Sequence, residues 1–386
     1  MKGGFPLKEF SIPLKEKIRR IDPIVLLCVI GMNIMSIVTL LSEVDAFAEG
    51  VGMWYVRMQT IVSVAGLLIV LVFAFIDYDA LFQKIKYLLI PMAIILILVV
   101  KKFGSGRYGN DNWITIPGTT ISVQPTEFVK LLLIVSFAMH LDRVKEKLNA
   151  PLSILTLALH AGLYVGMIVW QGDTGMALVY IGILVIMLFG AGISYWYIAG
   201  AGAATVLGFP ILWNGYLSDT QRKRILYGFS PDLDPTDKGW QAIASRSSII
   251  AGGFRGAGFN GGTKYYTLKF AAQSDFIFAV LAEKFGFLGT FLYLSLVVLL
   301  ILRIFWIARG TRKNYASYIC IGVAGMILVQ AAENIGMCLA ILPVVGITCP
   351  FLSYGPSSLL SMYLAIAMVE SICTHQQKYY FEREPE

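Results

Sequence analysis

Charged residues are scarce in this sequence. Asp, Glu, Lys and Arg make up 14% of its 386 residues, whereas 57% of the chain is hydrophobic. Soluble domains usually contain about 25% charged residues. The shortage excludes an ordinary soluble domain and indicates a protein that crosses a membrane several times.

Cysteine and histidine are also few, and their positions fit no metal or disulfide framework. The five cysteines form no C-x-x-C pair, and the three histidines lack metal-ligand spacing. The net charge of +7 is spread over many short segments and forms no single basic face. Because nucleic-acid binding requires such a face, we expect no zinc site, no disulfide framework and no nucleic-acid partner.

Long apolar runs are what the sequence has in abundance. A membrane helix needs about 20 apolar residues. One long connection, residues 214–275, lies outside these runs. The pattern predicts an all-α polytopic membrane protein with about ten transmembrane helices and one long extracytoplasmic loop between helices 7 and 8. The expected helices are 24–42, 59–76, 85–100, 124–141, 152–170, 174–191, 194–213, 276–305, 315–345 and 356–374.

The two ends of the chain frame this membrane domain. We expect a basic N-terminal segment at 1–23, a transmembrane domain at 24–374 that includes the loop, and a tail at 375–386. A signal peptide is an alternative for the first apolar run, but its hydrophobic core would usually span only about 7–15 residues. We therefore interpret 24–42 as an uncleaved first helix.

Lysine and arginine predict the orientation. If the N-terminus is cytoplasmic, the short cytoplasmic segments and the two ends hold 17 basic residues, and the short outer loops hold four. Cytoplasmic loops of membrane proteins carry the excess of Lys and Arg. Both termini are therefore expected in the cytoplasm, and the 214–275 loop outside it.

Charges within the apolar runs are the first candidate functional residues, because each costs roughly 2.5–3.5 kcal/mol in hydrocarbon. Glu127 and Lys130, three residues apart on one helix face, should pair with each other. They follow Gln124, and Trp113 lies just outside the helix. The pair could lock two helices together, or it could form the charged wall of a buried cavity.

Two aspartates lie at the expected outer ends of helices. Asp173 sits in a glycine-flanked turn, and it could be a simple turn residue or half of an acidic site with Asp275. Ser274 or Asp275 could likewise be only the cap of the helix that follows. Glu283 lies eight residues beyond Asp275, about 80° around an ideal helix. It is too deep to be a cap and must meet a partner or a watery cavity.

The segment 330–360 is the last concentration of polar groups. Glu333 and Asn334 lie within an apolar run, which two prolines and a glycine then interrupt. Irregular backbone at membrane depth survives only inside protein or beside water. The polar residues thus gather at the outer ends of the helices. This placement suits a molecule with an outer headgroup and a lipid tail, handled by an outer-leaflet lipid enzyme or a lipid transporter.

Several motifs, in order and across nearly the whole chain, resemble the SEDS family (shape, elongation, division and sporulation), whose members include RodA, FtsW and SpoVE. Its patterns Q-P-S-E-x-x-K, Q-P-D-x-G-T-A, R-I-x-x-F, H-T-D-F-I-F-A-V and P-F-x-S-Y-G-G-S-S are similar to stretches of this sequence. The matching stretches begin at Gln124, Gln171, Arg224, Gln273 and Pro350.

The resemblance implies a ten-helix peptidoglycan glycosyltransferase. Such an enzyme joins lipid II units into glycan strands, carried on undecaprenyl pyrophosphate, at the outer face of the bacterial cytoplasmic membrane. Its implied partner is a class B penicillin-binding protein, the transpeptidase that crosslinks the strands. The aspartate that the family cannot work without corresponds to Asp275, which we expect to be catalytic.

The remaining candidates follow from this resemblance. Arg224 and Arg246 would stabilise a leaving pyrophosphate, and Mg²⁺ or Mn²⁺ at Asp275 or Asp173 is left open as a cofactor. Gln124, Glu127, Lys130, Glu283 and Asn334 are expected to shape the interior cavity. The expected substrate-binding residues are Trp113, Asp173, Arg224, Gln241, Ser245, Arg246, Ser353, Tyr354 and Ser357.

The sequence departs from the family pattern at several positions. Asn112 replaces an arginine, Lys284 replaces the second glutamate of a pair, and Pro356 replaces a glycine. Glu333 is not expected before Asn334. These departures leave the subfamily open. They also leave two alternatives, a flippase for lipid-linked precursors and a non-catalytic scaffold for the transpeptidase.

Overall fold

The computed structural model describes residues 14–375, except 48, 108–109, 116–121, 216, 218, 235–238 and 263–271. Helices dominate it, and one small sheet joins three short antiparallel strands in the order β1-β2-β3. The elements are α1 (Leu14–Arg20), α2 (Pro23–Leu41), η1 (Val44–Ala46), α3 (Val51–Phe73), α4 (Tyr78–Ile85), α5 (Leu89–Phe103), β1 (Ser105–Arg107), β2 (Asn110–Thr115), β3 (Ser122–Val123), α6 (Pro125–Val144), η2 (Lys145–Lys147), α7 (Pro151–Gln171), α8 (Thr174–Gly190), α9 (Tyr195–Gly215), α10 (Asp219–Phe229), η3 (Pro231–Leu233), α11 (Trp240–Gly252), α12 (Ile277–Arg309), α13 (Asn314–Cys338) and α14 (Pro356–His375).

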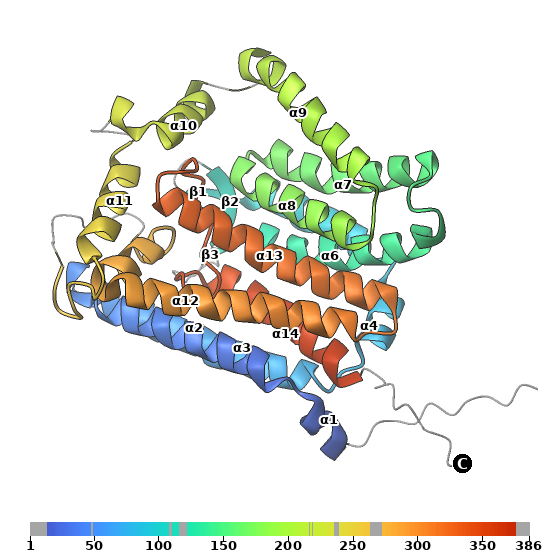
Figure 1. Ribbon diagram of the computed structural model, residues 1–386, viewed down its shortest axis with the longest axis horizontal. Helices are drawn as coiled ribbons and strands as arrows, with labels where there is room; N and C mark the ends of the chain where they lie inside the picture. The colour runs from blue at the N-terminus through green and yellow to red at the C-terminus, as the bar shows by residue number, and fades with distance from the viewer. Residues whose placement is uncertain are drawn as a thin grey trace, which may run out of the picture.

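The long helices lie side by side in one bundle, with α9 at its edge and α10 and α11 toward one end (Figure 1). Seven described helices are long and apolar enough to cross a membrane, and α4 with α5, bent by 70°, could form an eighth. The helix α8 is apolar but shorter. Each of the ten predicted segments coincides with a described helix. The prediction of an all-α polytopic membrane protein is confirmed.

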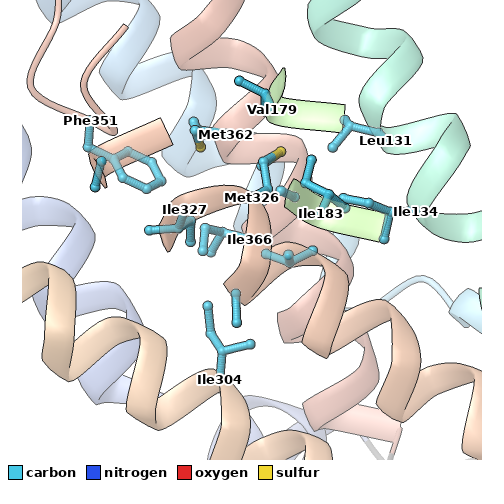
Figure 2. Close-up of a cluster of buried hydrophobic side chains, with 14 of the residues drawn as sticks. Leu131, Ile134, Val179, Ile183, Ile304, Met326, Ile327, Phe351, Met362 and Ile366 are labelled. Atoms are coloured by element: carbon cyan, nitrogen blue, oxygen red, sulfur yellow. The ribbon is translucent and has the colours of Figure 1, made fainter. Parts of the chain in front are cut away.

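The bundle has a buried interior and a side that faces outward. In the most apolar window of α14, 83% of the residues are buried, against 72% for α13 and none for α9. Side chains from α6, α8, α13 and α14, among them Ile134, Ile183 and Met362, meet in the core (Figure 2). The helix α3 approaches α14 at Gly66, where a Cβ atom would lie 2.1 Å from the Tyr363 ring. Exposed apolar residues such as Leu207 then suit contact with lipid.

The helix α14 fixes the direction of the bundle. At its C-terminal end, the Cys373 thiol donates to the carbonyl of Arg20 at 3.3 Å, and His375 contacts Lys17. Both ends of the described chain therefore lie at one end of the bundle. The first residue of α14, Pro356, lies about 30 Å away along the helix axis. The irregular segment 339–355, which precedes α14, occupies that opposite end.

The helix α12 is interrupted near that opposite end. Gly286 has φ 62° and ψ −156°, which are not helical values. The broken helix bonds instead to an adjacent loop: the amide of Ala257 donates to the carbonyl of Glu283 at 2.8 Å, and Phe287 donates to Gly253 at 2.9 Å. The single long helix predicted over 276–305 is thus two helical pieces joined at a break that the loop satisfies.

The ninth predicted segment is also shorter than expected. The helix α13 ends at Cys338, whereas the sequence predicts a span to residue 345. Pro343 lacks the amide proton that a helix would need, and residues 343–349 have no regular structure. This correction places residues 339–345 in an irregular loop, which continues through Gly346 and Ile347, rather than in a membrane helix.

Candidate functional site

Asp275 lies just before α12. Residues from the C-terminal part of the chain donate hydrogen bonds to its carbonyl and to those of the two residues before it. The amide of Tyr354 donates to the carbonyl of Gln273 at 2.8 Å, and the hydroxyl of Ser353 donates to the carbonyl of Ser274 at 2.6 Å. The side-chain amide of Asn334 donates to the carbonyl of Asp275 at 2.7 Å. Three consecutive carbonyls are thereby satisfied, so the main chain under the carboxylate is fixed.

Asn334 also connects Asp275 to the irregular loop. Its amide nitrogen donates to the carbonyl of Ile347 at 2.7 Å. In the same loop Gly346 has φ 69°, and a Cβ atom on it would lie 3.4 Å from Oδ2 of Asp275. The left-handed backbone favours glycine here. The irregular loop therefore approaches the carboxylate with its backbone rather than with a side chain.

The Asp275 side chain is not a helix cap. The N-cap position of α12 is Phe276, and no side chain caps this helix. Burial raises the pKa of Asp275 to about 6, although a hydrogen bond from Ser274 acts in the opposite direction. Because burial disfavours the charged form of a carboxyl group, this acid can accept and release a proton near neutral pH.

Asp173 forms a second acidic group at the same end of the bundle. It caps α8 by accepting a hydrogen bond from the amide of Met176 at 3.0 Å. Asp173 therefore stabilises the turn before α8, which is one of the two roles expected for it. Its other oxygen accepts from the side-chain amides of Asn112, at 3.0 Å, and Gln124, at 3.3 Å. Burial raises the pKa of Asp173, and the nearby charge of Glu127 adds to the effect.

The irregular loop lies between the two aspartates. A Cβ atom on Gly175, two residues after Asp173, would lie 2.8 Å from the carbonyl of Val345. The next loop residue, Gly346, approaches Asp275 as described above. The described residues contain no hydrogen bond between the two carboxylates. The structure brings Asp173 and Asp275 to one region without joining them.

The predicted pair of Glu127 and Lys130 forms. The Lys130 ammonium lies 2.6 Å from Oε2 of Glu127, and both side chains are buried. The hydroxyl of Ser361, on α14, donates to the same oxygen at 3.1 Å. The pair therefore links α6 to α14 in the interior, as a structural ion pair would. A role in a cavity wall stays a prediction.

Glu283 lies apart from that pair. It belongs to the short piece of α12 before the break, where a Cβ atom on Gly262 would lie 2.8 Å from its Oε1. The neighbouring Lys284 is 2.9 Å from Glu43 and donates to the carbonyl of Gly261 at 2.7 Å. Lys284, a departure from the family pattern, thus joins the α2–α3 connection to the long connection 214–275.

Several predicted substrate-binding residues hold the backbone. The hydroxyl of Ser245 donates to the carbonyl of Cys338 at 2.8 Å and fastens α11 to α13. The amide of Gln124 donates to the hydroxyl of Ser357 at 3.1 Å. The Tyr354 ring lies 4.7 Å from that of Tyr55, measured between centroids.

The other predicted residues differ in exposure. Arg246 on α11 is exposed, whereas Gln241 and Trp113 are partly buried. The side chain of Arg224 lies outside the part of the chain that the structure describes. Sequence reasoning identified Asn112 only as a departure from a pattern, and it missed the contact with Asp173. The contact depends on the fold bringing β2 to Asp173, the cap residue of α8, and no local signal in the sequence specifies this approach.

The fold and these contacts define a multi-pass helical membrane protein with an acidic site at one end of its bundle. A family model for the FtsW, RodA and SpoVE proteins, described as "Cell cycle protein", matches residues 20–378. The chain belongs to the FtsW/RodA/SpoVE family, as its motifs predicted.

Relatives and a solved structure agree with this assignment. The peptidoglycan glycosyltransferase MrdB of Escherichia coli K12 is 32% identical over 362 residues, 92% of this chain and 94% of that protein. A probable peptidoglycan glycosyltransferase FtsW from Trichlorobacter lovleyi is 28% identical over 359 residues, 91% of this chain and 92% of that protein. A chain from a study of polymerization and crosslinking by a peptidoglycan synthase complex is 26% identical, with a TM-score of 0.77, covering 92% of this chain and 98% of that one.

Proposed function

We propose that this chain is a peptidoglycan glycosyltransferase that polymerises lipid II at the outer face of the cytoplasmic membrane. The observation that carries the proposal is Asp275, whose main chain is fixed at three carbonyls while its pKa lies near 6. A positioned carboxyl group that titrates near the working pH is suited to general base catalysis. The names of two relatives give them the same activity.

The chemistry assigns a role to each charged group. The 4-hydroxyl of one sugar attacks the anomeric carbon of another, and Asp275 accepts the hydroxyl proton. A new carbon–oxygen bond forms while the bond from that carbon to the lipid pyrophosphate breaks, and the pyrophosphate leaves with the electron pair. Arg246 and Arg224 stabilise the charge on this leaving group, as cationic clamps do in phosphoryl transfer.

The two aspartates differ as candidate ligands for a divalent cation. Among the described residues, no three His, Cys, Asp or Glu side chains gather where they could hold a metal ion. N–H donors already occupy both oxygens of Asp173. Asp275 is therefore the better ligand, with pyrophosphate oxygens completing the site. Mg²⁺ or Mn²⁺ bound there would neutralise charge on the leaving group.

The orientation and partner follow from the same argument. Both ends of the described chain meet at one end of the bundle, and the basic residues favour the cytoplasm for that end. Asp275 then faces outward, where lipid II and the glycan on undecaprenyl pyrophosphate would reach it. The complex that contains the similar chain combines polymerization with crosslinking. A class B penicillin-binding protein is accordingly the expected partner.

The substrate contacts divide into two groups. Ser245, Ser353 and Ser357 bond to the backbone, so they act by shaping the site. Trp113, Gln241 and Tyr354 are the residues proposed to contact the sugar and peptide of the substrate, through aromatic faces and a side-chain amide. Glu127, Lys130 and Asn334 fix the interior behind the acidic site.

Polymerisation of lipid II by the purified chain tests the proposal. The chain is assayed in detergent, with and without a class B partner, and the products are separated on a gel. Wild type should yield glycan ladders, whereas folded Asp275→Asn and Asp275→Ala should yield none. Asp142→Asn is a matched control, because Asp142 pairs with Lys145 near the opposite end of the bundle. It should leave the ladders unchanged.

The alternatives predict other outcomes. If wild type with its partner and either cation gives no ladders, the polymerase proposal is wrong. Transport of lipid II across vesicles would then support the flippase. If the chain instead stimulates crosslinking by the transpeptidase, and Asp275→Asn stimulates it as strongly as wild type, the result would support the scaffold.

A further inference from the structure

A stack of exposed phenylalanine rings joins the segment after α11 to α12. The ring of Phe254 lies 5.8 Å from that of Phe287, and the ring of Phe287 lies 5.7 Å from that of Phe291, measured between centroids. The three side chains are 61%, 54% and 57% exposed, in the order of the chain. Contiguous exposed apolar surface marks a contact with a membrane or with another protein.

The helix α12 fixes the depth of this stack in the membrane. Its regular part begins at Phe287, just after the break, and ends at Arg309. That part is about 33 Å long, close to the thickness of the hydrocarbon core, about 30 Å. Phe287 therefore lies near the hydrocarbon boundary at the end of the bundle that holds the acidic site, and Phe291 lies one turn deeper. Because the Phe254 ring stacks on Phe287, it lies at the same boundary.

The backbone of residues 253–258 is suited to that depth. Main-chain polar groups in hydrocarbon need partners within the protein. The carbonyls of Gly253 and Phe254 accept hydrogen bonds from the first two amides after the break, at 2.9 and 3.2 Å. In return, the amides of Ala257 and Gly258 donate to two carbonyls just before the break, at 2.8 and 3.0 Å. The segment and the broken helix thus satisfy each other without water.

Arg255 adds a cation beside the aromatic stack. It follows Phe254 directly in the stretch Gly-Gly-Phe-Arg-Gly at 252–256, and its side chain is exposed. At a membrane boundary, an arginine lays its apolar stem along apolar surface and keeps its guanidinium in the polar layer. There the guanidinium can bind phosphate oxygens through two parallel N–H donors. An aromatic ring toward acyl chains and an arginine toward phosphates are the parts of an interfacial anchor.

The stack also continues a longer apolar face of α12. After Phe287 and Phe291, this face includes Val298 and Leu302, which are exposed. Steps of four and seven residues keep these side chains on one side of the helix. On a helix that crosses a membrane, such a side contacts acyl chains. The surface that begins at Phe254 is therefore continuous with the surface that faces the lipid.

We propose that residues 253–258 form an interfacial anchor in the leaflet at the end of the bundle that holds the acidic site. Phe254 contacts the acyl chains of bilayer lipids, and Arg255 contacts their phosphates. Part of the long connection 214–275 is then embedded in the membrane rather than surrounded by water. This inference goes beyond the proposed glycosyltransferase function and needs neither substrate nor catalysis.

Photolabelling of the wild-type chain tests the contact with acyl chains. The full chain is placed in nanodiscs of phosphatidylcholine and phosphatidylglycerol that include a phosphatidylcholine with a diazirine on one acyl chain. After irradiation, labelled residues are located by mass spectrometry. We expect label on Phe254 as well as on Phe291, and none on Glu146, an exposed acid of η2. Label on Phe291 without label on Phe254 would overturn the proposal.

Spin labels measure the depth and test Arg255. Phe254→Cys and Glu146→Cys are labelled in the same nanodiscs, and the signal of labelled wild type is subtracted. Of the native cysteines, four are buried and one is half-buried. Oxygen, which dissolves in lipid, should relax the label at position 254 several-fold more than a water-soluble nickel chelate does, and the order should reverse at position 146. Adding Arg255→Glu should reduce the preference for oxygen at position 254, whereas Arg255→Lys should preserve it.

Three results of the spin-label experiment would overturn the proposal. The first is equal access of the nickel chelate to positions 254 and 146, which would place Phe254 in water. The second is exclusion of both reagents from position 254, which would mean that protein covers it. The third is a preference for oxygen that arises only when a class B partner is added. A wild-type chain that forms no glycan would leave all three readouts intact, so failure of the proposed function and failure of the anchor are distinguishable.

Discussion

Two aspartates at one end of the bundle and two at the other differ in the partners of their carboxylates. At the end that holds both described chain ends, Asp22 caps α2 and receives Arg303 at 2.7 Å. Asp79 there accepts from Lys313 and Tyr315. At the other end, Asp173 accepts hydrogen bonds from neutral amides only, and Asp275 forms no salt bridge among the described residues. A cation beside an acid stabilises its charge and the fold, whereas an acid without one remains available for chemistry.

The largest expected effect comes from replacing Asp275, the acid that has no cation beside it in the described structure. Asp275→Asn keeps the shape of the side chain but cannot accept a proton, so polymerisation of lipid II should fall about 10²–10⁴-fold. The unfolding temperature should stay within a few degrees of wild type, since the three backbone contacts persist. Equal rates for the two proteins would remove Asp275 from the mechanism.

Replacing Asp22, at the opposite end, should lower stability and leave the polymerisation rate nearly unchanged. Asp22→Ala removes the partner of Arg303 and a helix cap, and the loss of one partner of a buried pair costs about 3 kcal/mol. We expect a clearly lower unfolding temperature in detergent and, below it, a polymerisation rate close to wild type. A stable Asp22→Ala protein with no activity would contradict the division between the two ends.

Loosening the backbone under Asp275 should have an intermediate effect. Asn334→Ala removes the amide donor from the carbonyls of Asp275 and Ile347, leaving Asp275 only the weak thiol donor of Cys338 at 3.7 Å, and a buried carbonyl that loses its partner costs about 1–3 kcal/mol. We expect a lower kcat for lipid II with little change in KM. Asn149→Ala is the matched control, because Asn149 accepts from the amide of Ser194 on an exposed connection, and it should not change the kinetics.

The pH dependence of the polymerisation rate should report on the titration of Asp275 in the wild-type chain. The pKa of Asp275 is raised from 3.8 to about 6 by burial, and the base must be deprotonated to work. Activity should therefore be half-maximal near pH 6, approach its full value about one unit above that pH, and fall toward tenfold for each unit well below it. A rate that stays constant from pH 7 to pH 5 would exclude Asp275 as the base.

The smallest expected change is at Asn112. Asn112→Ala removes one of two amide donors to Oδ2 of Asp173, and a hydrogen bond to a charged group is worth about 1.5–3 kcal/mol. Because Gln124 and Met176 still bond to the carboxylate, polymerisation should slow only several-fold. An arginine at this position, as in the family pattern, should restore the rate. A complete loss in Asn112→Ala would mean that Asn112 acts on the substrate itself.

The sequence predicted the membrane helices and the pairing of Glu127 with Lys130, because apolar runs and a three-residue spacing are local properties. It also named Asp275 as a candidate catalytic residue through its motif. It did not predict the break at Gly286 or the end of α13 at Cys338. The break depends on a loop some 30 residues earlier in the chain, whose amide groups replace those of the helix. Likewise, the contacts of Asn112 and Asn334 join segments far apart in the sequence, and only the folded chain specifies them.

The most direct test compares the two ends in one experiment. Lipid II polymerisation and thermal unfolding are measured for wild type, Asp275→Asn and Asp22→Asn under the same detergent conditions, with the class B partner present. The account predicts that Asp275→Asn unfolds like wild type and forms glycan about 10²–10⁴-fold more slowly, while Asp22→Asn unfolds at a lower temperature and forms it at close to the wild-type rate. Glycan ladders from folded Asp275→Asn at the wild-type rate would contradict the central claim.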